Sequence, residues 1–368
     1  MLRHLLHQNP GISGCEQYAH DLIVSTLQQL SPTALHTHVG GYGVVAFWGD
    51  STKPCIALRA DTDALPINES NTLPYCSHTA GISHKCGHDG HTATLLQVAQ
   101  LLVNQIANLD TGILLIFQPE EETGTGACKM IASGILQQYN IKAIYGYHNL
   151  PGFGLGDVVI CNRTFAAASS GVIYSLQGRQ THASTPEKGI NPGRAIAQII
   201  NQILDLSSAV DADIDQFRQA TLICTKIGDE AFGTSAGYGQ VMFTLRAYTN
   251  QNMRQLQDAA DTIAQTAAHK YGLTLNTSLR EPFHATENHP QCVNHIRDIA
   301  LRHHYVITEK DLPFRWSEDF AEYLLHYPGA LFGIGAGKNH PELHHPDYDF
   351  PDEIINPAAQ LLLSIACE

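Results

Sequence analysis

Apolar runs that end in side chains typical of metal ligands constrain the fold of this chain more than any other feature. Three such runs occur: residues 55–58 before Asp61 and Asp63, residues 113–117 before Glu120-Glu121-Glu122, and residues 143–147 before His148. Stretches with helical periodicity, such as 91–102, lie between or beside them. Alternating strands and helices predict an α/β fold with a mostly parallel, mixed sheet and helices on both faces. Strand ends in such sheets present functional groups at one edge.

The pattern changes between residues 170 and 280. Two amphipathic helices are expected at 195–206 and 253–271, and runs of half-exposed strand character occur at 172–176, 222–227 and 241–248. This order predicts a smaller α+β, ferredoxin-like domain. Ligand-type residues are scarce within it and return after Pro282. We therefore expect a catalytic, metal-binding domain of residues 1–169 and 281–368, interrupted by a smaller domain of residues 170–280.

Composition excludes several classes of function. The formal net charge is −14, from 21 Lys and Arg against 35 Asp and Glu, and no basic cluster offsets it, so we expect no nucleic-acid or membrane partner. The nine cysteines are scattered, which is typical of reduced thiols in a large chain. With no secretory signal and no apolar run of ~18 residues, the expected location is the cytoplasm.

Cys86 and His88 lie two residues apart in the segment Lys85-Cys86-Gly87-His88-Asp89-Gly90-His91. On a loop, both side chains can turn toward one metal ion. The same segment equally fits a buried thiol beside Asp89 as the N-cap of a helix that begins near His91. A covalent Cys86–His88 catalytic pair is disfavoured, because the spacing is awkward and the downstream carboxylates would have no role.

Glu121 and Glu122 follow the apolar run 113–117, and adjacent residues of an extended segment point in opposite directions. One carboxylate can then bind a metal while the other orients a water. A solvated acidic turn is the alternative, but like charges at the mouth of a buried strand are costly without a cation. Together with the Cys and His donors, these residues suit two divalent metals with a bridging water and a spare carboxylate, which passes the proton to the leaving nitrogen of an amide.

The motifs, taken in order, resemble those of the M20 metallopeptidases, in particular the amidohydrolase branch. That branch includes hippurate hydrolases, N-acyl-amino-acid amidohydrolases and plant auxin-conjugate hydrolases. The matching motifs run nearly end to end: Arg3-x-x-Leu6-His7-x-x-Pro10 with Glu16, Arg59-Ala60-Asp61-Thr62-Asp63-Ala64-Leu65-Pro66, Cys86-Gly87-His88-Asp89-Gly90-His91, Phe117-Gln118-Pro119-Glu120-Glu121-Glu122, Gly146-Tyr147-His148, His182-Ala183-x-x-Pro186, Ser317-Glu318-Asp319-Phe320 and Leu343-His344-His345-Pro346.

The resemblance implies a role for each site residue. The implied ligands of two divalent ions (Zn, Mn, Co or Ni) are Cys86, in place of the bridging aspartate of other branches, His88, Glu122, His148 and His344. Glu121 is the implied general base, and Asp63 would orient a ligand His. His182, reaching from the smaller domain or across a dimer, would stabilise the oxyanion and bind substrate, and Arg246 would bind substrate.

The resemblance also implies hydrolysis of the amide bond of small N-acyl amino acids such as hippurate, with the smaller domain serving as a lid and as the contact of a homodimer. The alternatives are a dipeptidase or aminoacylase, or a degenerate member that binds metal or ligand without turnover. Two departures affect this interpretation. Gly233 stands where the family has a substrate-binding Asn, and Lys85, a cation beside Cys86, would favour the thiolate.

Overall fold

The computed structural model describes residues 1–103 and 111–368, which form two compact units. The larger unit contains Met1–Phe165, Thr286–Asp311 and Asp319–Glu368, and the smaller unit contains Ala166–Ala285 and Leu312–Glu318. The assignment of residues 1–169 and 281–368 to catalysis, and of 170–280 to a lid, stays a prediction about function. No helix among the described residues is long and apolar enough to cross a membrane.

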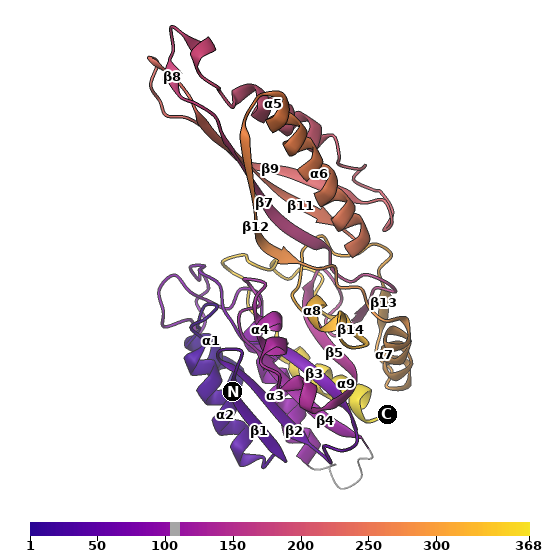
Figure 1. Cartoon of the computed structure of the whole chain (residues 1–368). Coiled ribbons are helices and arrows are strands. Elements are labelled where there is room, and N and C mark those ends of the chain that lie inside the picture. Colours follow the sequence, from indigo (N-terminus) through magenta and orange to yellow (C-terminus); the bar gives the residue numbers. More distant parts are fainter. Residues whose placement is uncertain (104–110) are drawn as a thin grey trace. The chain divides into compact units, whose positions relative to one another are not determined.

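Within the described residues, a mixed eight-stranded sheet forms the centre of the larger unit (Figure 1). Its order is β1-β2-β4-β3-β5-β14-β6-β13. The strands are β1 (Ala34–Val39), β2 (Gly43–Trp48), β3 (Pro54–Asp61), β4 (Gly112–Gln118), β5 (Asn140–Pro151), β6 (Val158–Ile160), β13 (Ile307–Glu309) and β14 (Gly329–Gly337). The neighbours β4, β3, β5 and β14 run parallel, so their carboxyl ends lie at one edge. The expected α/β fold with a mostly parallel, mixed sheet is confirmed.

Helices pack on both faces of this sheet, because its central strands are apolar on both sides. In β4, Ile113, Leu115 and Phe117 join one core, while Leu114 and Ile116 are fully buried on the other face. Helices that contribute to the first core are α1 (Leu2–Gln8), α2 (Gln17–Gln29), α3 (His88–Val103), α7 (Pro290–Arg302) and α9 (Ile355–Cys367). The remaining helical elements are α4 (Gly126–Ala132), which contacts β4 and α8 (Ala321–Leu324), and the short turns η2 (Leu136–Gln138) and η4 (Asp352–Ile354).

The smaller unit is α+β. Its antiparallel sheet has the order β12-β7-β11-β9, and a short ribbon pairs β10 with β8. The elements are β7 (Ala168–Gln177), β8 (Thr181–His182), η3 (Pro186–Lys188), α5 (Gly193–Leu204), β9 (Arg218–Ile227), β10 (Thr234–Ser235), β11 (Tyr238–Ala247), α6 (Asn250–Lys270) and β12 (Thr274–Phe283). The apolar sides of α5 and α6 pack on one face of the sheet in a core of their own. The sequence patterns predicted all of the longer elements except β12, whose side chains are largely polar and exposed.

The larger unit is built from segments on both sides of this insertion. At the junction, the Phe165 N–H donates to the Thr286 carbonyl at 2.8 Å. Residues 166–285 therefore leave the larger unit and return to it at neighbouring points, and residues 312–318 form a second, shorter segment of the smaller unit.

Candidate metal centre

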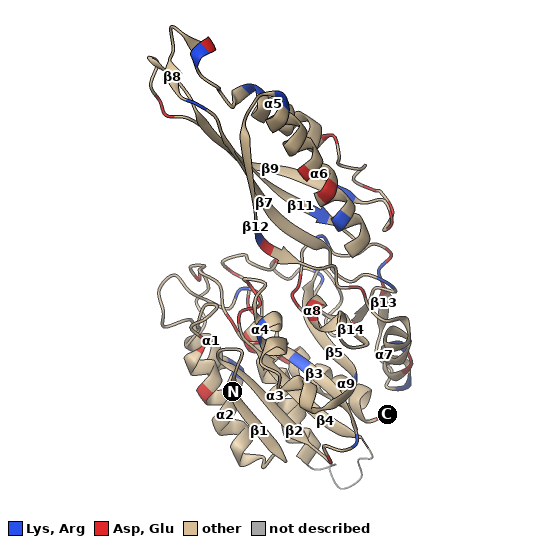
Figure 2. Cartoon of the chain, viewed as in Figure 1, with Lys and Arg blue, Asp and Glu red and all other residues tan. Residues whose placement is uncertain are grey.

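The predicted ligands of the larger unit gather at the carboxyl edge of its central strands. Asp63 follows β3, Glu121 and Glu122 follow β4, and His148 lies on β5. His148 was expected at the end of its strand, but β5 continues to Pro151. Figure 2 shows acidic residues in the loops beside α4, the part of the chain that holds these glutamates.

The Cys86-Gly87-His88 segment is not an extended loop, because α3 begins at His88 instead of near His91. Asp89 therefore lies in the first turn of the helix, and its carboxylate pairs with His7 and Arg3. Gly87 has a φ of +93°, and a Cβ atom there would lie 2.7 Å from the Asn149 side chain. A glycine thus lets the backbone bend beside β5, which places Cys86 and His88 next to each other at the strand ends.

Five predicted ligands come together in this way. Cys86 Sγ lies 3.5 Å from His148 Nε2. Glu122 Oε1 lies 3.8 Å from Nε2 of both His88 and His344. Metal bonds of about 2.1 Å put tetrahedral ligand atoms roughly 3.4 Å apart, so these spacings suit shared ions. Cys86 belongs to two groups whose ligand atoms all lie within 4.8 Å, one with His88 and His148 and one with Glu122 and His344.

Hydrogen bonds orient both buried imidazoles for ligation. His88 Nδ1 donates to the Asp63 carbonyl at 3.0 Å and faces its carboxylate at 3.3 Å, and His148 Nδ1 donates to the Asn149 carbonyl at 2.8 Å. In this tautomer, each ring directs the lone pair of Nε2 into the cluster once it has lost its second proton. His88 Nε2 and Glu122 Oε1 are buried with no hydrogen-bond partner among the described residues. Buried polar atoms are normally paired, and a divalent cation fits both.

The electrostatics of the cluster favour positive charge. Burial lowers the pKa of His88, but Asp61 and Cys86 outweigh burial and raise it well above its usual value. Burial, opposed by His88 and aided by Asp63 and Asp61, raises the pKa of Glu122 to about 7. Carboxylates and a thiol that stabilise an added proton here would stabilise a metal cation for the same reason.

The expected effect of Lys85 on the thiol is wrong. Its ammonium donates to Glu69 at 2.7 Å and to the Tyr348 carbonyl at 2.8 Å. Burial, followed by the charge of Glu122, raises the pKa of Cys86 well above that of a free thiol. A thiolate at this position therefore calls for a directly bound cation instead of a neighbouring lysine.

Glu121 lies beside the cluster and is 6% exposed. Its Oε1 accepts the Asp319 N–H at 3.3 Å, and it groups with His88 and Glu122 within 4.8 Å. The structure thus places a carboxylate next to the candidate ligands, as the role of a general base requires.

Sequence reasoning missed His91 as a supporting residue. Its Nδ1 donates to Asp61 at 2.6 Å, and its Nε2 accepts the Asn149 N–H at 3.2 Å. Asp61 also pairs with Arg59 at 2.7 Å. The spacing of three between His88 and His91 was the available signal, because residues i and i+3 share one side of a helix.

His182, Arg246 and Gly233 belong to the smaller unit. His182 on β8 is exposed, and its Nδ1 accepts the Ser184 N–H at 3.1 Å. Arg246 on β11 donates to the Arg315 carbonyl at 2.8 Å and to Ser317 Oγ at 3.1 Å. Gly233 has open space around it, since an added Cβ would meet nothing within 4 Å.

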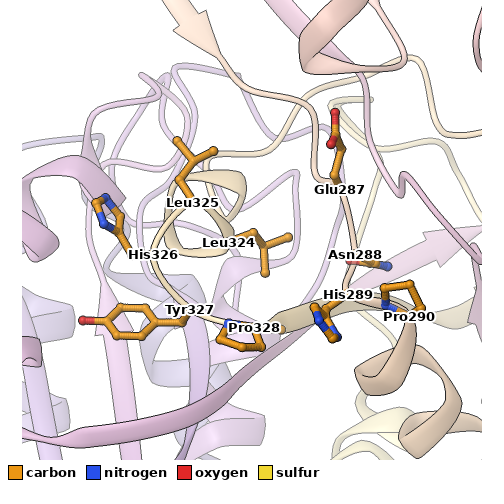
Figure 3. Close-up of a pocket in the computed structure, with 10 residues that line it drawn as sticks. Glu287, Asn288, His289, Pro290, Leu324, Leu325, His326, Tyr327 and Pro328 are labelled. Atoms are coloured by element: carbon orange, nitrogen blue, oxygen red, sulfur yellow. The ribbon is translucent and has the colours of Figure 1, made fainter.

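A separate cavity of about 390 Å³ lies where β14 begins (Figure 3). Glu287 and Asn288 before α7, and Tyr327 and Pro328 before β14, are among the residues that line it. None of the predicted site residues lines this cavity. It lies at the opposite end of β14 from the loop that carries His344.

Comparison with known proteins matches residues 57–368 to the model of peptidase family M20/M25/M40. The chain belongs to this family. Membership of the M20 family confirms the class expected from the sequence, a metal-dependent amidohydrolase. The chain is 32% identical over 370 residues to N-acetyl-L-cysteine deacetylase of Bacillus subtilis, covering 99% of this chain and 86% of that protein. It is 30% identical over 377 residues to the IAA-amino acid hydrolase ILR1-like 5 of Arabidopsis thaliana, covering 99% of this chain and 85% of that protein.

Among solved structures, the chain resembles the YXEP protein of Bacillus subtilis, which is described as a dinuclear metal binding peptidase from the M20 family. The TM-score is 0.85 at 26% identity, and the match covers 100% of this chain and 96% of that one. The M20 family thus accounts for both units of the fold.

Proposed function

We propose that the chain hydrolyses the amide bond of small N-acyl amino acids with two divalent ions held by Cys86, His88, Glu122, His148 and His344. One observation carries this proposal. His88 Nε2 and Glu122 Oε1 are buried, 3.8 Å apart and without hydrogen-bond partners among the described residues, and Cys86 and Glu121 lie beside them.

The donor set of thiol, imidazole and carboxylate suits Zn, Mn, Co or Ni. When bound, such ions would polarise the substrate carbonyl and acidify a water molecule. Glu121 would accept the proton of the attacking water and return it to the leaving nitrogen. Asp63 would hold the ring of His88 through Nδ1, which leaves Nε2 for the metal.

The names of the relatives support N-acyl amino acids as substrates. N-acetyl-L-cysteine deacetylase and the IAA-amino acid hydrolase both act, by name, on an amide that joins an acyl group to an amino acid. His182 would donate a hydrogen bond to the developing oxyanion, and Arg246 would bind the substrate carboxylate. A dipeptide substrate is the alternative within the same chemistry, and a hydrolase assay with both substrate classes separates the two.

We further propose that the smaller unit is a lid and that it joins two copies of the chain. The edge strand β9 supports this, because Leu222 and Ile223 on it are 37% and 59% exposed. An apolar sheet edge is suited to pairing with a second copy. Ile223→Lys should then convert a dimer to a monomer in light scattering.

The nine cysteines, all free in the described chain, support the expected cytoplasmic setting.

Replacement of Glu121 by Gln tests the proposed function. The variant keeps the shape of the side chain but cannot accept a proton, so turnover of N-acetyl amino acids should fall about 10²- to 10⁴-fold. Bound metal, measured by mass spectrometry, should remain at the wild-type level. Glu309→Gln makes the same chemical change on β13 and should leave turnover unchanged. Wild-type turnover in Glu121→Gln would refute the assignment of Glu121, and no hydrolysis by the wild-type protein loaded with any of the four metals would refute the proposed function.

A further inference from the structure

Glu16 is a buried carboxylate to which the proposed mechanism gives no role. It is 1% exposed and stands at the N-cap of α2, but its side chain makes no capping hydrogen bond to that helix. Its Oε1 accepts the N–H groups of Gly14 and Glu120, each at 3.0 Å. The carboxylate therefore accepts a hydrogen bond from the turn after β4, which is more than 100 residues away in the sequence.

That turn carries both candidate functional glutamates and has a strained backbone. Glu120 has a φ of 57°, a left-handed conformation that side chains other than glycine seldom adopt. The Gly126 N–H donates to the Glu120 carbonyl at 3.1 Å, and the Gly124 N–H donates to the Glu121 carbonyl at 2.8 Å. These two bonds fix the carbonyl groups of Glu120 and Glu121, and Glu16 fixes the N–H of Glu120.

A second carboxylate holds the same turn two residues later. Asp63 Oδ2 accepts the Glu122 N–H at 3.0 Å and the hydroxyl of Ser13 at 2.7 Å. Ser13 and Glu16 belong to one short loop, and the Ala64 N–H fixes the start of that loop by donating to the Gly11 carbonyl at 2.8 Å. The loop 11–16 thus stabilises both ends of the segment from Glu120 to Glu122. Glu16 binds the first end directly, and Ser13 binds the second end through Asp63.

We propose that Glu16 is a positioning residue that sets the direction of Glu121 and Glu122 by holding the N–H of Glu120 in the left-handed turn. The inference rests on the proposed function, since it assigns Glu16 a role in placing the general base and one metal ligand. A purely structural role would explain its burial, but it does not explain why its acceptor oxygen is directed at the turn that carries Glu121 and Glu122. Glu16 Oε2 has no hydrogen-bond partner among the described residues, and burial together with Asp63 raises the pKa of Glu16 to about 7. A buried carboxylate with an unpaired oxygen lowers the free energy of unfolding. The presence of Glu16 in spite of this cost is consistent with a functional role.

Two substitutions separate the hydrogen bond from the charge. Glu16→Met fills a similar volume but removes the acceptor, so Glu121 and Glu122 should shift. We expect kcat for an N-acetyl amino acid to fall about 10- to 100-fold with KM within about threefold of wild type. Mn²⁺ affinity, measured by calorimetry on the metal-depleted full chain, should weaken about tenfold. Glu16→Gln keeps the acceptor oxygen and should restore both values to within about threefold of wild type.

Asn288→Ala is the matched control. Asn288 is also buried, and it donates to the Leu331 carbonyl at 2.8 Å and accepts the Leu331 N–H at 2.9 Å, away from the turn. It should lower the melting temperature without changing kcat or Mn²⁺ affinity. If Glu16→Met does not fold, Glu16→Asp, whose shorter side chain cannot reach both N–H groups, replaces it with the same expected losses.

Three results would overturn the inference: wild-type kcat and Mn²⁺ affinity in a folded Glu16→Met or Glu16→Asp protein, equal losses in Asn288→Ala, or losses in Glu16→Gln as large as those in Glu16→Met. Failure of the wild-type protein to hydrolyse amides would instead refute the proposed function. The Mn²⁺ affinities would still decide whether Glu16 positions Glu122.

Discussion

Cys86 Sγ and His148 Nε2 lie 3.5 Å apart, and both residues are buried. They come from segments separated by 62 positions, one before α3 and one on β5. Cys86 belongs to two groups of candidate ligands, one with His88 and His148 and one with Glu122 and His344. A thiol common to both groups should contribute to the binding of more than one ion.

Cys86→Ser should therefore lower the affinity for Zn²⁺ at least tenfold, because a hydroxyl is a poorer ligand than a thiolate for a borderline-soft metal. Zn²⁺ titration of the metal-depleted protein by calorimetry measures the effect. Cys128→Ser is the control, since Cys128 is exposed and belongs to none of the candidate groups found among the described residues. Equal Zn²⁺ affinity in wild type and Cys86→Ser would rule out Cys86 as a ligand.

Metal removal should destabilise the protein, because the buried donors lose the cation that compensates them. A ligand at 100 times its Kd adds about 2.7 kcal/mol to the free energy of unfolding. That corresponds to a fall in Tm of roughly 5–10 °C after dialysis against a chelator. Differential scanning calorimetry would show the fall and its reversal by added Mn²⁺ or Zn²⁺. His88→Ala should show a much smaller response, and an equal response would place the bound metal elsewhere.

The stability of the larger unit should decrease with pH above neutrality because of His7. Burial lowers the pKa of His7, but Asp89 and Glu69 raise it more, to about 9 from a usual 6.5. A raised pKa stabilises the folded state below 6.5, and this contribution disappears as the pH rises through 9, a loss of roughly 3 kcal/mol. Urea unfolding between pH 6 and 10 measures the slope. His7→Gln should flatten it, and an unchanged slope in that variant would exclude His7 as its source.

Gly233 offers a gain-of-function test. An added Cβ there meets no atom within 4 Å, so Gly233→Asn should fold normally. If the position contacts substrate as the family resemblance implies, one new hydrogen bond of about 1.4 kcal/mol should lower KM for N-acyl amino acids about tenfold. Gly233→Ala adds the Cβ without the amide and should leave KM unchanged. Equal KM values in all three proteins would show that residue 233 does not contact substrate.

The strand pattern predicted the sheet correctly because β2, β3, β4 and β5 are short apolar runs bounded by polar residues. Grouping of the candidate ligands at one edge followed from the rule that parallel strands end together. The start of α3 was predicted three residues late, since nothing local shows that Gly87 bends against Asn149. Contacts of this kind depend on tertiary packing, which residue spacing alone does not encode.

Long-range polar contacts were the part of the site that sequence could not predict. The bond from Glu120 N–H to Glu16 spans 104 positions, and no periodicity links the two residues. The environment of Lys85 was also misjudged, because adjacency to Cys86 does not determine where a long side chain points. Its ammonium instead meets Glu69 and a backbone carbonyl.

The hydrogen bond between Phe165 and Thr286 has a consequence for how such proteins diversify. Since the polypeptide exits and re-enters the larger unit at adjacent points, residues 166–285 can vary in length and sequence with little effect on the sheet beside which Cys86 and Glu122 lie, provided that they still accommodate residues 312–318. Recombination or grafting at this junction would exchange most of the smaller unit while keeping the residues of the candidate metal centre. If the smaller unit takes part in substrate selection as proposed, new specificities need not be accompanied by a new reaction centre.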